Sequence, residues 1–302
     1  MRTGIPNGWL KASCLISALC LLGVQGLAQA RAEKSTVRVA VATNFVTTLK
    51  ALSKDFESFD SGKILISAGS TGKLYAQIRQ GAPYDIFLAA DQERPQLLEQ
   101  HGFTVTNSRF TYANGALVLW QPNKTTRPAV NEGESPAEPS LQIRHWLEGA
   151  SSIALANPRL APYGFAAQEV LHNLQITATT PQRQVTGENI GQTFSLVATG
   201  NANVGFVAAA QMLEQKQPPA TYVNIPSELH SPILQDAVQL KFSANNPPAT
   251  RFMQYLASSR AEKIIREAGF FAGSEAGPKT DQRTDQRTDQ RTDQRTGLKP
   301  DQ

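Results

Sequence analysis

Cysteine is almost absent from this 302-residue sequence, which has only two. Both of them, Cys14 and Cys20, lie in an N-terminal segment that we expect to be removed from the mature chain. A mature chain without cysteine has no disulfide, no thiol nucleophile and no cysteine ligand for zinc. We therefore expect a fold stabilised by apolar burial, with a function that needs no sulfur chemistry.

Long hydrophobic runs are also scarce, and the most prominent run covers residues 12–24. Arg2 and Lys11 precede it, and the Ala-Gln-Ala of residues 28–30 supplies the small-x-small pattern of a cleavage site. This arrangement predicts a signal peptide over residues 1–30 and export to the periplasm. A membrane anchor is the alternative, but the run is shorter than the roughly 20 residues of a spanning helix.

Neither sign of charge dominates, because basic and acidic residues are nearly equal in number. The sequence carries 29 Lys and Arg against 25 Asp and Glu, a net charge of +4. Removing Arg2 and Lys11 with the signal peptide leaves about +2, from 4 minus 2. No basic cluster with interleaved aromatic residues stands out, so we expect no nucleic-acid partner.

The C-terminal end is poor in apolar residues. From Thr280 the sequence repeats Thr-Asp-Gln-Arg, and no apolar side chain follows until Leu298. Such a segment cannot bury enough apolar surface to offset the entropy lost on ordering. We predict a disordered tail over residues 273–302, outside the fold.

Catalytic signatures are few. The four histidines have no metal-binding spacing, and Walker A and Gly-x-Ser-x-Gly patterns are absent. Ser70 and Lys73 form a Ser-x-x-Lys spacing, as in some serine acyltransferases, but the Ser-Asp-Asn and Lys-Thr-Gly elements that accompany it there are missing. An exported serine hydrolase that uses Ser70 and Lys73 is therefore a remote alternative, and we expect a protein that is not an enzyme.

Strands and helices alternate along the chain. β-Branched or apolar segments at 36–42, 63–68 and 84–90 read as strands, and each is followed by a helical pattern. Similar units recur after a Pro-rich stretch, residues 121–140, which reads as a loop. The alternation predicts an α/β fold with parallel strand pairing.

Several segments resemble the type II periplasmic binding proteins of ABC importers, and among these the molybdate-binding proteins. The match covers roughly residues 36–271. The segments that carry it are VATNF (41–45), SAGSTGKLYAQIRQGAPYDIFLAAD (67–91), RFTYANGALVLW (109–120), ANPRLAPYGFAAQEVL (156–171), GENIGQTFSLVATGNANVGFVA (187–208) and AEKIIREAGF (261–270).

This resemblance implies a two-lobe fold with a ligand cleft between the lobes. Residues 31–112 and 225–272 would form lobe one, and residues 113–224 lobe two. The hinge strands would lie near 110–113 and 223–227.

The resemblance also implies the residues that hold the oxyanion. Thr43 and Asn44 occupy the first strand-to-helix turn, and Thr71, with Ser70 beside it, occupies the second. The backbone N–H groups of Tyr163 and Ile190 would complete the set. Some members add a tyrosine hydroxyl where this chain has Ala208, so Asn44 would replace that donor.

Four turns share one design, at residues 43–45, 70–72, 162–165 and 189–191: each leads into a predicted helix. The start of a helix leaves N–H groups unpaired and carries about half a positive charge, which suits an anion without any Lys or Arg. Glycine at 72, 164 and 191 would let the backbone approach the ligand. Taken singly, Thr43, Ser70 and Thr71 could be simple N-caps.

The sequence therefore predicts an extracytoplasmic protein that captures molybdate, and also tungstate, and delivers it to an ABC-type permease. We expect a monomer with no cofactor and no bound metal cation. The main alternative is a binding protein for another oxyanion, such as sulfate or phosphate.

Overall fold

The computed structural model describes residues 36–122, 139–176 and 184–271. The predicted signal peptide, most of the predicted loop at 121–140 and the predicted tail at 273–302 lie outside the described residues. Among the described helices, none has the length and apolar character needed to cross a membrane.

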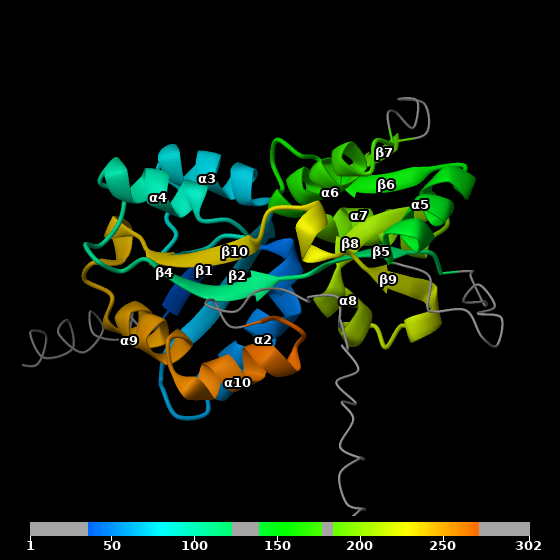
Figure 1. The fold of residues 1–302 in the computed structure, drawn as a ribbon. Helices are drawn as coiled ribbons and strands as arrows, with labels where there is room; N and C mark the ends of the chain where they lie inside the picture. Colours follow the sequence, from blue (N-terminus) through cyan, green and yellow to red (C-terminus); the bar gives the residue numbers. More distant parts are fainter. Residues whose placement is uncertain (1–35, 123–138, 177–183, 272–302) are drawn as a thin grey trace, which may run out of the picture.

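The first sheet has five strands in the order β2-β1-β3-β10-β4 (Figure 1). β1 pairs in parallel with β2 and β3, whereas β10 is antiparallel to both β3 and β4. The strand bounds are β1 Thr36–Ala42, β2 Lys63–Gly69, β3 Ile86–Leu88, β4 Phe110–Gly115 and β10 Ile233–Gln239.

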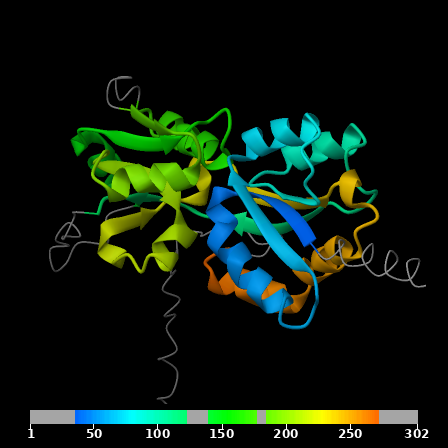
Figure 2. The same cartoon turned by 180° about the vertical axis from the view of Figure 1, so that it is seen from behind.

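Helices cover both faces of this sheet (Figures 1 and 2). Successive side chains of β1 point to opposite faces, so each face has apolar side chains for the helices to cover. Val37, Val39 and Val41 pack in the core beneath α2, α9 and α10, while Ala40 packs with residues of α3 and α4. The helix bounds are α2 Val46–Phe56, α3 Thr71–Arg79, α4 Glu93–Gln100, α9 Pro247–Leu256 and α10 Ser259–Glu267.

The second sheet also has five strands, in the order β7-β6-β8-β5-β9. One face packs against α5 and α6 and the other against α7 and α8, again with two separate cores. The bounds are β5 Leu117–Trp120, β6 Ile153–Ala156, β7 Gln184–Gly187, β8 Val204–Ala208, β9 Tyr222–Asn224, α5 Pro139–Gly149, α6 Pro162–Asn173, α7 Ile190–Ala198 and α8 Ala209–Glu214. Short 3₁₀ turns are η1 Thr43–Phe45, η3 Pro219–Thr221, η4 Ser227–Leu229 and η5 Lys241–Ser243.

The chain passes between the two sheets twice. Ala116 alone separates β4 from β5, and the return runs from the end of β9 at Asn224 to the start of β10 at Ile233. β4 continues to Gly115, beyond the expected lobe boundary at 112/113. The division of the chain into lobes at 112/113 and 224/225 stays a prediction. In the structure the chain leaves the first sheet after Gly115, three residues beyond the predicted first boundary.

Parallel pairing was predicted from the alternation of strands and helices and is confirmed for β1, β2 and β3, but two other strands depart from it. β10 is antiparallel to its neighbours in the first sheet, and β5 is antiparallel to β8 and β9 in the second. These are the first strands that the chain forms after each passage. A strand that enters directly from the other sheet has no helical crossover to set it parallel to its neighbours.

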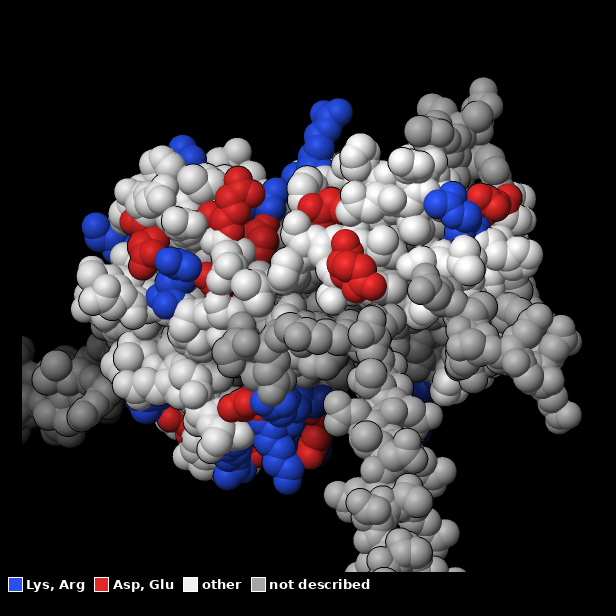
Figure 3. Space-filling view, in the orientation of Figure 1, with Lys and Arg blue, Asp and Glu red and all other residues white. Residues whose placement is uncertain are grey.

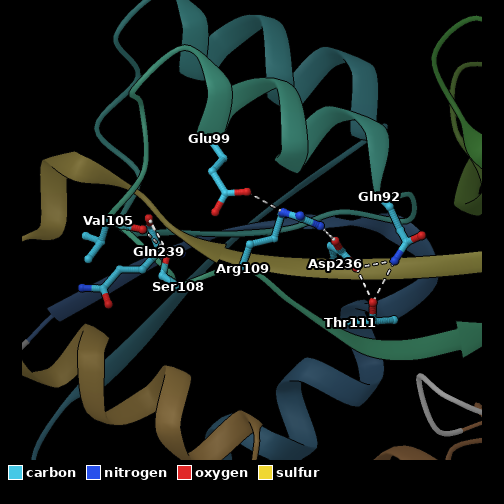
Figure 4. A network of polar contacts seen from close by, with 8 residues as sticks. All are labelled: Gln92, Glu99, Val105, Ser108, Arg109, Thr111, Asp236 and Gln239. Carbon is cyan, nitrogen blue, oxygen red and sulfur yellow. Dashed lines mark hydrogen bonds and ion pairs between the residues drawn. The ribbon is translucent and has the colours of Figure 1, made fainter.

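A buried carboxylate ties β10 to β4 (Figure 4). Asp236 is fully buried, and its two oxygens accept hydrogen bonds from Arg109 Nη1 at 2.7 Å and Thr111 Oγ1 at 2.7 Å. Arg109 Nε also donates to Glu99 at 2.9 Å, which connects the pair to α4. The strand register shifts beside Asp236, so Tyr112 has no partner in the ladder and forms a β-bulge.

We expect Arg109→Met to destabilise the fold by about 2–3 kcal/mol, because it leaves a buried carboxylate without its charged partner. Urea unfolding measures this change. Adding Asp236→Asn should recover part of the loss, since no buried charge then remains. Lys263→Met is the control: its ammonium is exposed, 3.9 Å from Glu267, and should change stability by less than about 0.5 kcal/mol. An equal effect of the two single substitutions would contradict this account.

Candidate functional site

The four predicted turns meet around one small cavity between the two sheets. Its volume is about 10 Å³, which is room for about one water molecule. All six residues predicted as the site line it. The full lining is Ala42, Thr43, Asn44, Gly69, Ser70, Thr71, Ala90, Ala161, Pro162, Tyr163, Asn189 and Ile190.

The lobe-one side of the cavity comes from the carboxyl ends of two neighbouring parallel strands. Thr43 and Asn44 follow β1, and Ser70 and Thr71 follow β2. β1 and β2 are in register up to Ala42 and Gly69, so the two turns lie side by side at one edge of the sheet. Tight turns here bury polar side chains: Asn44, Ser70 and Thr71 are at most 6% exposed.

Two buried polar atoms at this edge have no hydrogen-bond partner in the described part of the chain: Ser70 Oγ and Asn44 Oδ1. Ser70 precedes α3 but makes no capping hydrogen bond, so the simple N-cap alternative is wrong for its hydroxyl. Thr71 differs, because its Oγ1 accepts from Ala90 N–H at 3.1 Å and so fixes the end of β3. The unpartnered hydroxyl in the cavity is therefore that of Ser70.

The lobe-two side is formed by the starts of α6 and α7. α6 begins at Pro162 and has no side-chain cap, so Tyr163 lies in its uncapped first turn. α7 is capped by Asn189, whose Oδ1 accepts from Gln192 N–H at 2.9 Å. Two helix N-termini therefore face the two turns of lobe one, which gives the cavity a positive potential from backbone dipoles.

Direct contacts hold the two sides together. Thr43 Oγ1 donates to Asn189 Oδ1 and accepts from Gly191 N–H, both at 3.2 Å. Gly72 N–H donates to Leu160 O at 2.9 Å. Thr43 thus has hydrogen bonds to lobe two on both its donor and acceptor sides, and the structure shows the lobes in contact around the cavity.

The role expected for three glycines, close approach of the backbone to the ligand, stays a prediction. Gly72, Gly164 and Gly191 are not among the residues that line the cavity. They allow protein segments to approach one another: a Cβ on Gly164 would lie 2.1 Å from Ala156 O, and a Cβ on Gly72 3.1 Å from Leu160 Cα. Their small size is needed for packing at the edges of the site.

The cavity lining contains no Lys, Arg, His, Asp or Glu. Its one titratable side chain is the phenol of Tyr163, which is 1% exposed. Burial raises the pKa of Tyr163 far above its usual range, so this phenol stays neutral at physiological pH. The site therefore offers neutral hydroxyl, amide and N–H groups, together with helix dipoles.

Lys73 contributes to the contact between the lobes. Its ammonium lies 2.6 Å from Glu188 Oε2, across the lobe interface, and it is 45% exposed. The hydrogen bonds of the described residues include none between Lys73 and Ser70. This arrangement gives the Ser-x-x-Lys spacing a structural explanation and provides no base for a serine nucleophile.

One residue beside the cavity, Gln235, was not predicted from the sequence. It lies fully buried in β10, and Asn44 Nδ2 donates to its Oε1 at 2.9 Å. The segment ILQDAVQ, which forms β10, could have been read as a strand with buried polar positions. Ala208, where some relatives of the resembled family have tyrosine, is buried at the end of β8 and does not line the cavity.

Comparisons with known proteins agree with this architecture. The family model of the bacterial extracellular solute-binding proteins matches residues 37–271. The chain belongs to this family. Among its relatives, the molybdate-binding protein ModA of Azotobacter vinelandii is 39% identical over 81% of this chain and 93% of its own length. ModA of Rhodobacter capsulatus is 37% identical over 84% and 94%.

The solved structure of the Azotobacter vinelandii periplasmic molybdate-binding protein superposes with a TM-score of 0.67, at 36% identity over 78% of this chain and 98% of that one. A sulfate-binding protein from Mycobacterium tuberculosis superposes at 0.60 with only 11% identity, over 80% and 88%, and shows the fold alone. The predicted fold class, the α/β two-lobe fold of type II periplasmic binding proteins, is confirmed. The two relatives named above are both called molybdate-binding proteins, which is consistent with the expectation that this chain is not an enzyme.

We expect Lys73→Ala to weaken anion binding by no more than about fivefold, because an exposed ion pair contributes at most about 1 kcal/mol to closure. The small effect should vanish at 0.5 M salt, where surface charges are screened. Calorimetric titration at two salt concentrations measures it. Loss of binding by two orders of magnitude would show that Lys73 contacts the ligand directly.

Proposed function

We propose that this protein captures molybdate, and also tungstate, in the cavity between its lobes and delivers it to an ABC-type permease. The observation that carries the proposal is the convergence of Thr43, Asn44, Ser70, Tyr163 and Ile190 on one uncharged cavity. Relatives named molybdate-binding at 37–39% identity support the choice of ligand. A neighbour in fold is named as a tungstate ABC transporter protein from Geobacter sulfurreducens.

The ligand is held by hydrogen-bond donors alone in this proposal. The hydroxyl groups of Ser70 and Thr71 and the amide of Asn44 donate from lobe one, and Thr43 joins them by turning its hydroxyl proton from Asn189 Oδ1 to the ligand. The N–H groups of Tyr163 and Ile190 donate from lobe two. Each helix start adds about half a positive charge, so the dianion needs no Lys or Arg partner.

Such a site selects an anion without protons. Hydrogen phosphate would bring an OH group that meets only donors, at a cost of about 1–3 kcal/mol. Sulfate is fully deprotonated as well, and its exclusion depends on its smaller size. Binding of another oxyanion, such as sulfate or phosphate, is therefore the weaker alternative, since the relatives at 37–39% identity are named molybdate-binding.

The cavity is smaller than a tetrahedral oxyanion, so it has to widen when the ligand enters. We propose that the lobes, residues 31–112 with 225–272 and residues 113–224, move apart about two hinges. The first hinge is the passage from β4 to β5, and the second is the segment between β9 and β10. Ligand binding would favour the closed arrangement, and the closed form would dock on the permease.

The proposed setting is the periplasm, after removal of a signal peptide at residues 1–30. The solute-binding family and the periplasmic relative support it. We propose a monomer that carries out no covalent chemistry and binds no nucleic acid. On the face shown in Figure 3, acidic and basic side chains are interspersed, which favours neither a nucleic-acid surface nor a membrane surface.

Asn44→Ala tests the site. It removes one donor to a charged ligand and should weaken molybdate binding by about 1–3 kcal/mol, as measured by calorimetry. Asn201→Ala is the matched control, because that exposed amide donates to Thr199 Oγ1 away from the cavity. Its affinity should equal that of the wild type. Equal affinities of Asn44→Ala and wild type would overturn the assignment of Asn44.

A further inference from the structure

The amide of Gln235 connects both lobes at the back of the proposed binding site. Its Oε1 lies 2.9 Å from Asn44 Nδ2 and 3.2 Å from the Tyr112 hydroxyl, and its Nε2 lies 3.5 Å from the Tyr163 hydroxyl. Asn44 and Tyr112 belong to lobe one and Tyr163 to lobe two. The four side chains are at most 6% exposed, so their hydrogen bonds are formed with protein groups or a bound ligand rather than with bulk water.

The hydrogen bonds of this cluster are incompletely matched in the structure. The single hydroxyl proton of Tyr112 faces two acceptors, Gln235 Oε1 and Ala89 O at 3.1 Å. Asn44 Oδ1 is buried with no partner. Asn44 also directs its donor group at Gln235, while an oxyanion in the cavity requires a donor from Asn44.

Rotating both amides by 180° repairs each of these points. Gln235 Nε2 then occupies the position 2.9 Å from Asn44 and 3.2 Å from Tyr112, and it donates one proton to Asn44 Oδ1 and the other to the Tyr112 hydroxyl. Tyr112 is left to donate to Ala89 O, and the Tyr163 hydroxyl donates to Gln235 Oε1. Amide oxygen and nitrogen are nearly equal in size, so the rotated arrangement occupies the same space.

The rotated arrangement leaves Asn44 Nδ2 with its protons available for the ligand. We propose that Gln235 is a positioning residue: in this arrangement it donates to Asn44 Oδ1 and so holds the Asn44 amide with its donor toward the anion. Tyr163 completes the link, because its hydroxyl reaches Gln235 only when lobe two is closed onto lobe one. Ligand recognition at Asn44 is thereby coupled to closure through neutral groups.

Gly115 fits this role. A Cβ at Gly115 would lie 2.1 Å from the Tyr163 hydroxyl and 2.8 Å from Gln235 Nε2. Glycine at the end of β4 therefore makes room for the contact between Gln235 and Tyr163, at the point where the chain leaves the first sheet.

The inference rests on the proposed function, and a double-mutant cycle with the full chain and sodium molybdate tests both. Gln235→Met keeps the side-chain length but removes the amide, and should weaken binding about 5- to 50-fold in the wild type. In the Asn44→Ala background, the same substitution should change affinity by less than about twofold, because the group that Gln235 positions is gone.

Gln239→Met is the matched control. Gln239 is another buried amide of β10, and it donates to Ser243 O and Thr250 Oγ1 away from the cavity. The affinity of the Gln239→Met variant for molybdate should stay within about twofold of that of the wild type. Thermal unfolding of each variant shows whether a loss of affinity reflects a loss of fold.

Tyr163→Phe provides a second route if Gln235→Met does not fold, since it removes only one hydroxyl. It should weaken binding about 3- to 10-fold, although in our account the ligand contacts only the backbone of this residue. Two results would overturn the inference alone, provided that the wild type binds molybdate. One is that the effects of Gln235→Met and Asn44→Ala on affinity are additive. The other is that Tyr163→Phe leaves the affinity unchanged. A wild type that ignores molybdate would overturn the proposed function and the inference with it.

Discussion

Unpaired N–H groups at the starts of helices are the feature on which the rest of this structure depends. Each α/β unit ends a strand, turns and begins a helix, and so leaves donors at the carboxyl edge of its sheet. The two sheets face one another at these edges. The donors of α3 and η1 on one side and of α6 and α7 on the other thus surround the same small volume. This geometry attracts an anion before any particular side chain is considered.

The cavity is lined by neutral groups, and this determines how it can bind an anion. A buried cationic side chain would bind most anions and would carry a large desolvation cost when the site is empty. Hydroxyl and amide groups can exchange partners at lower cost, and the cluster of Asn44, Gln235, Tyr112 and Tyr163 offers two such arrangements. Charged pairs of the described residues lie away from the cavity; for example, Asp236 with Arg109 supports the first sheet, and Lys73 with Glu188 connects the surfaces of the two lobes. Stability and recognition therefore use different kinds of interaction.

Much of the fold and of the candidate site could be predicted because local patterns encode it. The alternation of Val37, Val39 and Val41 predicts a strand, and the turns after β1 and β2 carry their hydroxyl and amide groups in adjacent positions. The directions of β5 and β10 could not be predicted, because they follow from the two passages between sheets. The packing role of Gly164 also depends on a distant segment, the carbonyl of Ala156. Gln235 was missed for the same reason: its partners are 191, 123 and 72 residues away in sequence.

Calorimetric titration of the protein with molybdate, tungstate, sulfate and phosphate at neutral pH would test the proposed anion site directly. The account predicts tight one-to-one binding of molybdate and tungstate, weaker binding of sulfate, and the weakest binding of hydrogen phosphate, whose proton meets only donors. Equal binding of hydrogen phosphate and molybdate would contradict a cavity built from donors alone.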